Sequence, residues 1–259
     1  MSTNLPKMKP MFTKNTKYEI TFDRFEGPIK HRPIVIFRDE YAEITEDGKI
    51  IEKYYYIKTR SAHDRHGNRK KANKGEIFLE KAEIGLLTKD SYVDTTQIYS
   101  IKEEELSNIV DKKNVIFADT YDLTKYQIDK IYRSVLKNLT QEPPYVSLMD
   151  VKLNNKTNAF VGELKYSHKD FLYQEYSKSS RKDKEEFKDN ILKNKNLIEE
   201  TLIELRNLKN GVREEFSDIL WEWEDDKKFE QEKIEQKRLQ NIGDEKNEEF
   251  EKEGDDFTR

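Results

Sequence analysis

The chain has 259 residues, of which 39% are charged and only 34% are hydrophobic, and its mean hydropathy is −1.01. No stretch is apolar for long enough to span a bilayer, the start "MSTNLPKMKPMF" lacks the apolar centre of a secretion signal, and the absence of cysteine excludes disulfides and thiolate metal sites. We therefore expect a cytoplasmic protein without a membrane segment, part of which lies outside any packed core.

The net charge of −4 is unevenly spread along the chain. Residues 214–259 hold 18 acidic and 8 basic side chains, which leaves a charge of +6 for the first 213 residues. This asymmetry favours a body that attracts polyanions and an end that repels them. The plainer explanation is a solvated helix followed by a disordered end.

The residues from about 18 to 101 show mostly strand patterns. "RPIVIF" (32–37) is a short apolar run, rich in β-branched residues, that is typical of a buried strand. "YAEIT" and "IIEKYYYIKT" flank an Asp-Gly pair, which predicts a hairpin, and "GEIFLEK" and "SYVDTTQIYSI" continue the series of short strands. Residues 60–74 contain six Lys or Arg and no apolar periodicity, so we expect a loop there. Several short strands with turns between them predict a small barrel or sandwich.

A helix follows these strands. Thr124 and Gln127 have the spacing of a capping box, in which each side chain satisfies a free amide at the helix start. Apolar residues then recur at helical spacing on one face until two prolines end the pattern: Ile128, Ile131, Val135 and Leu139. We expect this helix to pack on the barrel and to close a first domain near residue 140.

The rest of the chain predicts a mixed extension. "YVSLMDVKL" and "NAFVGELKY" indicate a second hairpin within residues 145–166, and apolar stripes follow on a helix that ends at Gly211 and on another that ends at Trp223. Beyond Glu224 the apolar residues are too sparse to form a face. The predicted organisation is a barrel domain (15–140), a hairpin-plus-helix extension (145–240) and an acidic, disordered tail (241–259).

Four segments, taken in order, resemble the MazF/PemK family of toxin endoribonucleases: "KHRPIVIF" (30–37), "YYIKT" (55–59), "GLLTKDSYVDTTQIYSIKEEEL" (85–106) and "LTKYQIDKIYRSVLKNL" (123–139). In that family an Arg-Pro opens a core strand, a later strand ends in Thr, a Gln-Ile strand precedes a short helix, and a capped helix finishes the fold. The resemblance covers about residues 15–140. It implies an α+β fold with an SH3-like barrel that forms a homodimer, cuts single-stranded RNA without a metal or cofactor, and binds an acidic antitoxin protein.

The resemblance also implies a catalytic pair, Arg32 and Thr59. Cleavage by the ribose 2′-OH gathers negative charge on phosphorus, and a preorganised arginine with bidentate donors stabilises that charge as it develops. The Thr59 hydroxyl would orient the phosphate or the 2′-OH. His31 is the best candidate for a further general acid or base, although a surface histidine is the plainer reading. Considered alone, Arg32 and Thr59 also fit an exposed strand end and an ordinary sheet position.

Two departures from the family limit what can be carried over. The region before Arg32 keeps only Gly27 of the family's glycine-rich loop, so no cut-site preference is transferred. Plasmid-type members place an Arg and an Asp just ahead of the Gln, where this chain has Asp94 and Thr96, so no second acid–base pair is assigned.

Basic residues around the loop are candidates for sequence-independent, salt-sensitive RNA binding. The expected RNA-binding set is Lys30, Lys58, Arg60, Arg65, Arg69, Lys70, Lys71, Lys74 and Gln97. Tyr54–Tyr56 either offer a face for base stacking or pack a half-buried sheet. The sequence "HDRH" (63–66) suggests metal ligands, but a basic loop would hold them poorly, and we expect no metal site.

The stretch "FSDILWEWEDD" (216–226) joins two tryptophans to five acids. Because antitoxins of the family are acidic peptides with bulky anchors, this stretch is a candidate for shielding the active site or docking another protein; helix packing through tryptophan is the alternative. The expected function is a metal-independent endoribonuclease toxin of a toxin–antitoxin or phage-defence system. The alternative is a non-catalytic RNA-binding or protein-interaction module on the same barrel.

Overall fold

The chain forms two compact units, Met1–Arg213 and Glu214–Arg259. The boundary coincides with the change from net positive to net negative charge along the sequence. A computed structural model describes residues 10–12, 19–21, 27–28, 33–38, 43–44, 50–51, 53–82, 87, 89–110, 123–154, 156, 159–171 and 195–255.

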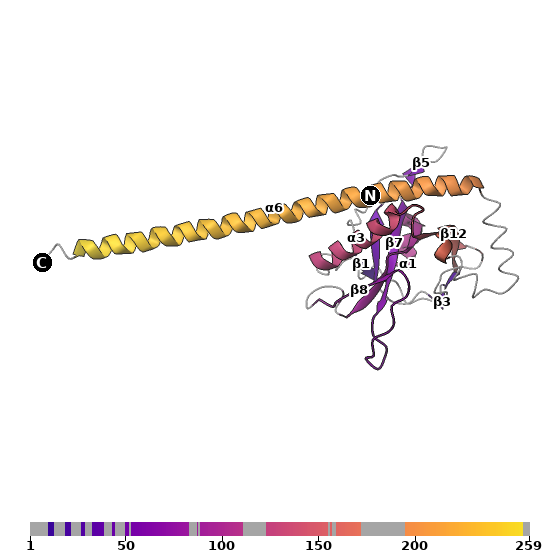
Figure 1. Cartoon of the computed structure of the whole chain (residues 1–259), viewed down its shortest axis with the longest axis horizontal. Helices are drawn as coiled ribbons and strands as arrows, with labels where there is room; N and C mark the ends of the chain where they lie inside the picture. The colour runs from indigo at the N-terminus through magenta and orange to yellow at the C-terminus, as the bar shows by residue number, and fades with distance from the viewer. Residues whose placement is uncertain are drawn as a thin grey trace. The chain divides into compact units, whose positions relative to one another are not determined.

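The first unit is built on one mixed sheet (Figure 1). Its strands pair in the order β1-β4-β7-β10-β11-β12-β2-β3, with β8 and β9 beside β7, and a separate pair of short strands, β5 and β6, forms the hairpin predicted around the Asp-Gly turn. The bounds are β1 Pro10–Phe12, β2 Glu19–Thr21, β3 Gly27–Pro28, β4 Pro33–Arg38, β5 Glu43–Ile44, β6 Ile50–Ile51, β7 Lys53–Ser61, β8 Glu76–Leu79, β9 Ser91–Asp94, β10 Gln97–Lys102, β11 Ser147–Asn154 and β12 Ala159–Ser167.

The sheet is open among the described strands. β1 and β3 stand at the two ends of the pairing order, and no described residues of these two strands pair with each other. The mixed α+β class expected from the sequence is confirmed, but the described strands do not close into the small barrel that the strand pattern predicted.

The predicted boundary near residue 140 falls inside a crossover between two neighbouring strands. β10 and β11 run parallel, with Ile98 opposite Leu148, and α1 (Glu103–Ile109) and α3 (Lys125–Thr140) lie in the chain between them. Parallel neighbours require such a crossover connection. The hairpin predicted within 145–166 is confirmed as β11 and β12, and it belongs to the same sheet as β7 and β10.

Successive side chains of β7 point to opposite faces of the sheet. Tyr54 and Tyr56 join a buried cluster with apolar residues of β10, β11 and β12 and with Leu106 and Ile109 of α1. The rings of Tyr56 and Tyr99 stack with centroids 4.8 Å apart. All three tyrosines of the "YYY" run are buried, which confirms sheet packing rather than a base-stacking surface.

Helix α3 forms because its start is capped and one face is apolar. The Thr124 hydroxyl accepts from the amide of Gln127, and the Gln127 side chain accepts from the amide of Thr124, as the capping-box spacing predicted. Ile131, Val135 and Leu139 are buried on the inner face. The side chains of Gln127 and Asn138 also donate to the backbone carbonyls of Glu80 and Thr95, which ties the helix to the loops beside the sheet.

The long helix α6 (Lys195–Asp255) differs from what the sequence predicted. In its first part Thr201, Leu205, Leu208 and Val212 are buried at helical spacing, as the apolar stripe predicted. The helix then continues through Gly211, which was expected to end it, and extends to Asp255 through the segment expected to be disordered. No helix among the described residues has the length and apolar character needed to cross a bilayer.

Candidate nucleic-acid interface

The predicted catalytic residues fall on or next to two neighbouring strands. β4 and β7 are antiparallel, with Ile34 opposite Lys58 and Val35 opposite Ile57. The start of β4, which directly follows Arg32 in the sequence, therefore lies beside the second half of β7, which carries Thr59. Arg32, His31 and Lys30 themselves lie outside the described residues.

Thr59 is buried in the sheet. It lies opposite Val93 of β9, and its relative exposure is 1%. Gln97, at the start of β10, is also buried, and its backbone amide donates to the Asp94 carboxylate at 3.2 Å. Lys58 is half-buried, with its ammonium 4.2 Å from the centre of the Tyr99 ring. These three residues belong to the sheet rather than to an open surface.

Asp94 and Thr96 have a structural role at the break between β9 and β10. Asp94 Oδ1 accepts from the amide and the hydroxyl of Thr96, at 3.0 and 2.7 Å. Thr96 in turn lies against Gly75, whose φ of +89° is left-handed and whose missing Cβ would fall 2.1 Å from Thr96 Oγ1. This arrangement supports leaving these two residues out of any acid–base pair.

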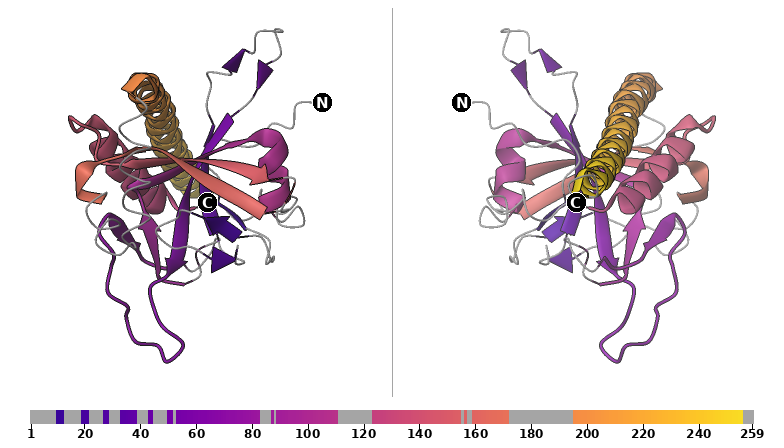
Figure 2. Two further views of the ribbon diagram at one scale, coloured as in Figure 1. Left: turned by 90° about the vertical axis from the view of Figure 1, so that its right-hand side faces the viewer. Right: turned by 90° about the vertical axis from the view of Figure 1, so that its left-hand side faces the viewer.

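The end of β7 and the segment that leads to β8 form an ordered projection (Figure 2). We call residues 61–74 of this projection the basic hairpin. The amide of Lys70 donates to the carbonyl of Ala62 at 2.7 Å, and His63 and Arg69 form a β-bridge. At the tip, the Asp64 carboxylate accepts from the amides of His66 and Asn68 at 2.8 and 2.9 Å. These bonds lower the pKa of Asp64, the Asn68 amide contributing most. The expected loop is confirmed, and one β-bridge and these turn hydrogen bonds hold its two arms together.

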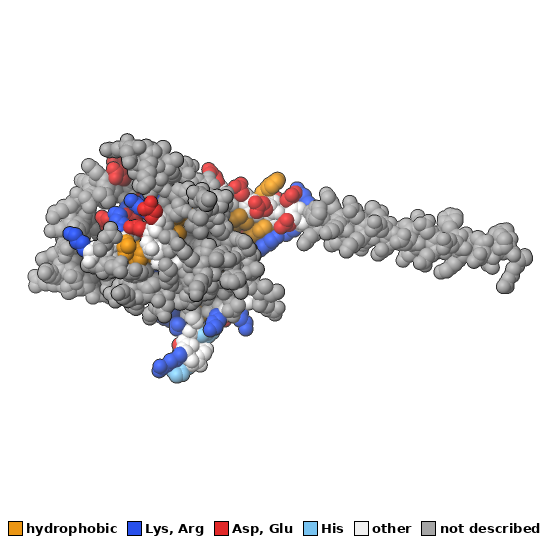
Figure 3. Space-filling model, turned by 180° about the vertical axis from the view of Figure 1, so that it is seen from behind, with side chains coloured by type: hydrophobic (Ala, Val, Ile, Leu, Met, Phe, Trp, Pro, Cys, Tyr) orange, Lys and Arg blue, Asp and Glu red, His pale blue; other side chains and the backbone are white. Residues whose placement is uncertain are grey.

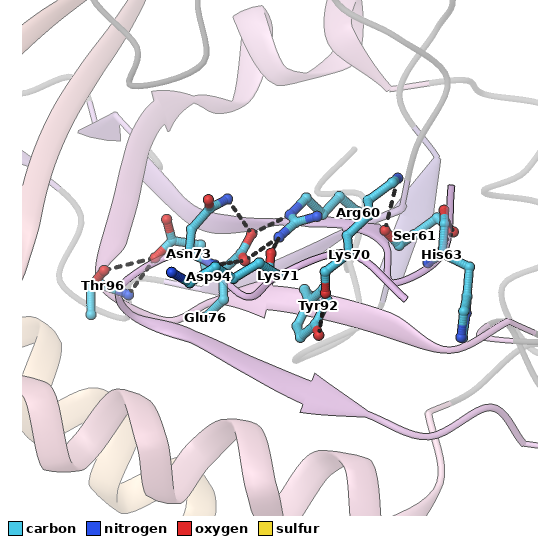
Figure 4. Close-up of polar contacts among 10 residues, drawn as sticks. All are labelled: Arg60, Ser61, His63, Lys70, Lys71, Asn73, Glu76, Tyr92, Asp94 and Thr96. Atoms are coloured by element: carbon cyan, nitrogen blue, oxygen red, sulfur yellow. Dashed lines mark hydrogen bonds and ion pairs between the residues drawn. The ribbon is translucent and has the colours of Figure 1, made fainter. Parts of the chain in front are cut away.

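The base of the basic hairpin is anchored by an ion pair (Figure 4). The Arg60 guanidinium donates to both carboxylate oxygens of Glu76, at 2.5 and 2.6 Å, and to the carbonyl of Lys71 at 2.8 Å. The Glu76 side chain is only 2% exposed and also accepts from the amide of Asn73. Arg60 therefore holds the base of the basic hairpin in place and is not positioned as an RNA contact.

This ion pair changes the pKa of both partners. The hydrogen bond to Glu76 is the main cause of a raised Arg60 pKa. Burial by itself raises the pKa of Glu76, but the hydrogen bonds from Arg60 and from Asn73 outweigh it, and the net pKa is lowered. Both groups therefore stay charged at neutral pH.

A second set of contacts supports the returning arm. The Tyr92 hydroxyl donates to the carbonyl of Lys70 at 2.9 Å and accepts from Arg69 Nε at 3.3 Å. The Arg69 guanidinium also lies over the Phe78 ring, 4.0 Å from its centre. Arg69 remains an exposed residue, so its charge still faces solvent.

The other cations of the basic hairpin differ in exposure. Arg65 and Lys71 lie on the surface of the projection, where basic side chains and histidines gather (Figure 3). Lys70 is half-buried, and its ammonium donates to the carbonyl of Ser61 at 3.2 Å. Lys74 is paired away from the tip, 3.3 Å from Asp170, and its pKa is raised by hydrogen bonds to Tyr145 and Asp170.

The "HDRH" segment is arranged for a turn rather than for a metal. The Asp64 carboxylate is directed to turn amides, Arg65 Nε donates to His66 Nε2 at 3.0 Å, and His63 Nδ1 lies 3.9 Å from Asp90. Within the part of the chain that the structure describes, no three His, Asp or Glu side chains gather as a set of metal ligands.

The sequence interpretation missed a second charged cluster, centred on Glu204 of α6. Glu204 accepts from Lys53 Nζ at 2.8 Å and from the Tyr55 hydroxyl at 2.9 Å, and Lys165 lies 3.6 Å away. Lys165 is also 3.8 Å from Asp150, which accepts from Ser100 at 2.9 Å. Burial raises the pKa of Asp150, but Lys165, Lys152 and Ser100 outweigh it and lower the pKa. The cluster links α6, through Glu204, to β7 and β12.

The available signal for this cluster was weak. Lys53 and Tyr55 share one face of a predicted strand, and Glu204 lies inside a predicted apolar stripe. Lys53 and Tyr55 lie 151 and 149 positions from Glu204 in the chain, and no sequence spacing predicts contacts over such separations.

Comparison of the chain with family models, with curated proteins and with solved structures finds no match in any of the three.

Proposed function

We propose that the protein is a metal-independent endoribonuclease of the MazF/PemK kind, acting on single-stranded RNA. The observation that carries the proposal is the antiparallel pairing of β4 with β7. It makes neighbours of the strand that follows Arg32 and the strand that bears Thr59, as a shared phosphate site requires. The order of elements in the resemblance, with the capped helix α3 last, supports the same function.

In the proposed reaction the 2′-oxygen forms a bond to the adjacent phosphorus while the bond from phosphorus to the 5′-oxygen breaks. The 2′-OH loses its proton, and the departing 5′-oxygen gains one. Arg32 would stabilise the charge on the phosphoryl oxygens, and removal of one such donor typically costs about 10²- to 10³-fold in rate. His31 remains the candidate for proton transfer.

A cleavage assay in EDTA tests this function. Wild-type protein should cut an unstructured RNA, and Arg32→Ala and Thr59→Val should each lower the rate by about 10²-fold or more. Arg133→Ala is the matched control, because Arg133 is an exposed arginine of α3 paired with Asp129 and distant in sequence from β4 and β7. Wild-type activity in the Arg32→Ala variant would overturn the assignment.

The burial of Thr59 and Gln97 favours a second candidate, a non-catalytic RNA-binding module. A buried hydroxyl can contact a phosphate only if the residues that cover it move, whereas Arg65, Arg69 and Lys71 of the basic hairpin are already exposed. Binding of RNA without cleavage under any of the assay conditions would select this alternative. The proposal further includes a homodimer and an acidic protein partner, which follow from the resemblance alone.

A further inference from the structure

We propose that the basic hairpin binds the sugar–phosphate backbone of double-helical RNA and so anchors structured RNA next to the cleavage site. The choice of RNA over DNA rests on the proposed function. The binding itself rests on the shape, charge and composition of the hairpin.

Contacts at the arms, the tip and the base hold the basic hairpin in one shape. The bridge between His63 and Arg69 and the Asp64 turn bonds fix its arms and tip, while the Arg60–Glu76 pair fixes its base. A projection held in one shape loses little conformational entropy on binding. Its exposed cations can reach the phosphates that border the wide, shallow minor groove of duplex RNA.

The exposed cations lie at the tip and on the returning arm. Arg65 is at the turn, and Arg69 and Lys71 are on the returning arm, all three exposed. Basic side chains that neutralise phosphates supply most of the sequence-independent affinity for nucleic acid. Arg60 and Lys74 are excluded from this set because Glu76 and Asp170 already pair with them.

The hairpin lacks the features of a single-strand binder. Residues 61–74 contain no Phe, Tyr or Trp, and the nearby tyrosines 54–56 are buried. Proteins that bind single strands without sequence preference stack bases on aromatic side chains, whereas duplex RNA is recognised by shape and by phosphate and 2′-OH contacts. Alanine is the only aliphatic residue type in the segment, at positions 62 and 72, which also disfavours a protein partner held by apolar burial.

The test is a binding titration with labelled RNA of about 20 base pairs, the matching single strand, and a DNA duplex of the same sequence. Wild-type protein should bind the RNA duplex more tightly than either of the others. Arg65→Ala combined with Lys71→Ala should weaken duplex binding by roughly tenfold or more and reduce the slope of log K against log salt by about 2. Arg133→Ala should change neither quantity.

Several results would overturn the inference: equal or tighter binding of the single strand, a preference for DNA, unchanged affinity in the hairpin double variant, or binding of a polyacidic peptide with no RNA duplex binding. Because both replaced side chains are exposed, unchanged near-ultraviolet circular dichroism confirms that the variant is folded. The two proposals fail separately. If cleavage depends on Arg32 but duplex binding is unchanged in the hairpin double variant, only the proposed RNA-binding role of the hairpin is refuted. If the protein binds duplex RNA but cleaves no RNA, only the proposed nuclease activity is refuted.

Discussion

The base and the tip of the basic hairpin each contain an arginine and a glycine, but these residues have different roles at the two places. Arg60 at the base donates twice to a buried carboxylate, whereas Arg65 at the tip is exposed. Gly75 at the base is packed against Thr96, whereas Gly67 at the tip has open space beyond its Cα. The comparison teaches that local surroundings, above all a carboxylate within reach, decide whether a cation supports the fold or faces a ligand.

The two glycines give the largest expected difference. Gly75→Ala should lower the free energy of unfolding by about 4 kcal/mol, because it adds left-handed strain and a clash with a buried threonine. Gly67→Ala, with a φ of +83° but no neighbour within 4 Å, should cost only about 1 kcal/mol. Urea unfolding followed by near-ultraviolet circular dichroism measures both, since the buried tyrosines lie in the sheet. Equal losses would contradict the distinction.

The two arginines should separate stability from binding. Arg60→Ala should cost about 3 kcal/mol of unfolding free energy, because the buried Glu76 carboxylate loses its charged partner. Arg65→Ala should stay within about 0.5 kcal/mol of wild type, as exposed substitutions do. The same urea titration applies. Tryptophan fluorescence is unsuitable here because both tryptophans, at 221 and 223, lie in the Glu214–Arg259 unit. A stable Arg60→Ala protein would show that the anchor is not needed.

The Glu204 cluster extends the comparison to a second set of paired cations. Glu204→Gln should cost about 2 kcal/mol, since the buried ammonium of Lys53 keeps only a neutral acceptor. Glu200→Gln, an exposed position one turn earlier on α6, is the control and should change little. Hydrogen exchange at the start of α6 should rise in the first variant alone. Unchanged protection there would indicate that apolar packing, not the cluster, holds the helix.

The smallest effect concerns pH. The pKa of Glu76 is lower in the folded chain than its ordinary value of 4.5, so its stabilising contribution is full above that value and is lost as the pH falls through the lowered folded pKa. Unfolding free energy should therefore decline below about pH 4.5, and less steeply in Glu76→Gln. Asp129→Asn, which removes a half-buried carboxylate paired with the exposed Arg133, is the control. Parallel curves for wild type and Glu76→Gln would refute this linkage.

The sequence predicts local elements better than their assembly. The capping box at Thr124, the strand after Arg32 and the 145–166 hairpin each depend on residues close in the chain, and each is confirmed. The parallel pairing of β10 with β11 joins residues about 50 positions apart, and no local pattern marks it. Gly211 fits a helix end by residue type, but its φ is not left-handed and α6 continues through it.

The candidate site shows the same division. A count of basic residues drew attention to 60–74, but it could not show which of these residues already pair with a carboxylate. Glu76 lies sixteen positions from Arg60 across a turn, and Asp170 lies 96 positions from Lys74. The sequence interpretation therefore could not separate Arg60 and Lys74, which pair with carboxylates, from the other cations of the predicted RNA-binding set. The Arg32 prediction lies outside the described residues and remains a prediction.

The most direct test of the central claim is the chemistry of the RNA ends produced by wild-type protein in EDTA. Attack by the 2′-OH leaves a 2′,3′-cyclic phosphate on one fragment and a 5′-hydroxyl on the other, and the account predicts these ends, with their formation abolished in Arg32→Ala. Fragments that carry 5′-phosphates, cleavage that requires an added divalent metal, or intact RNA throughout would contradict it.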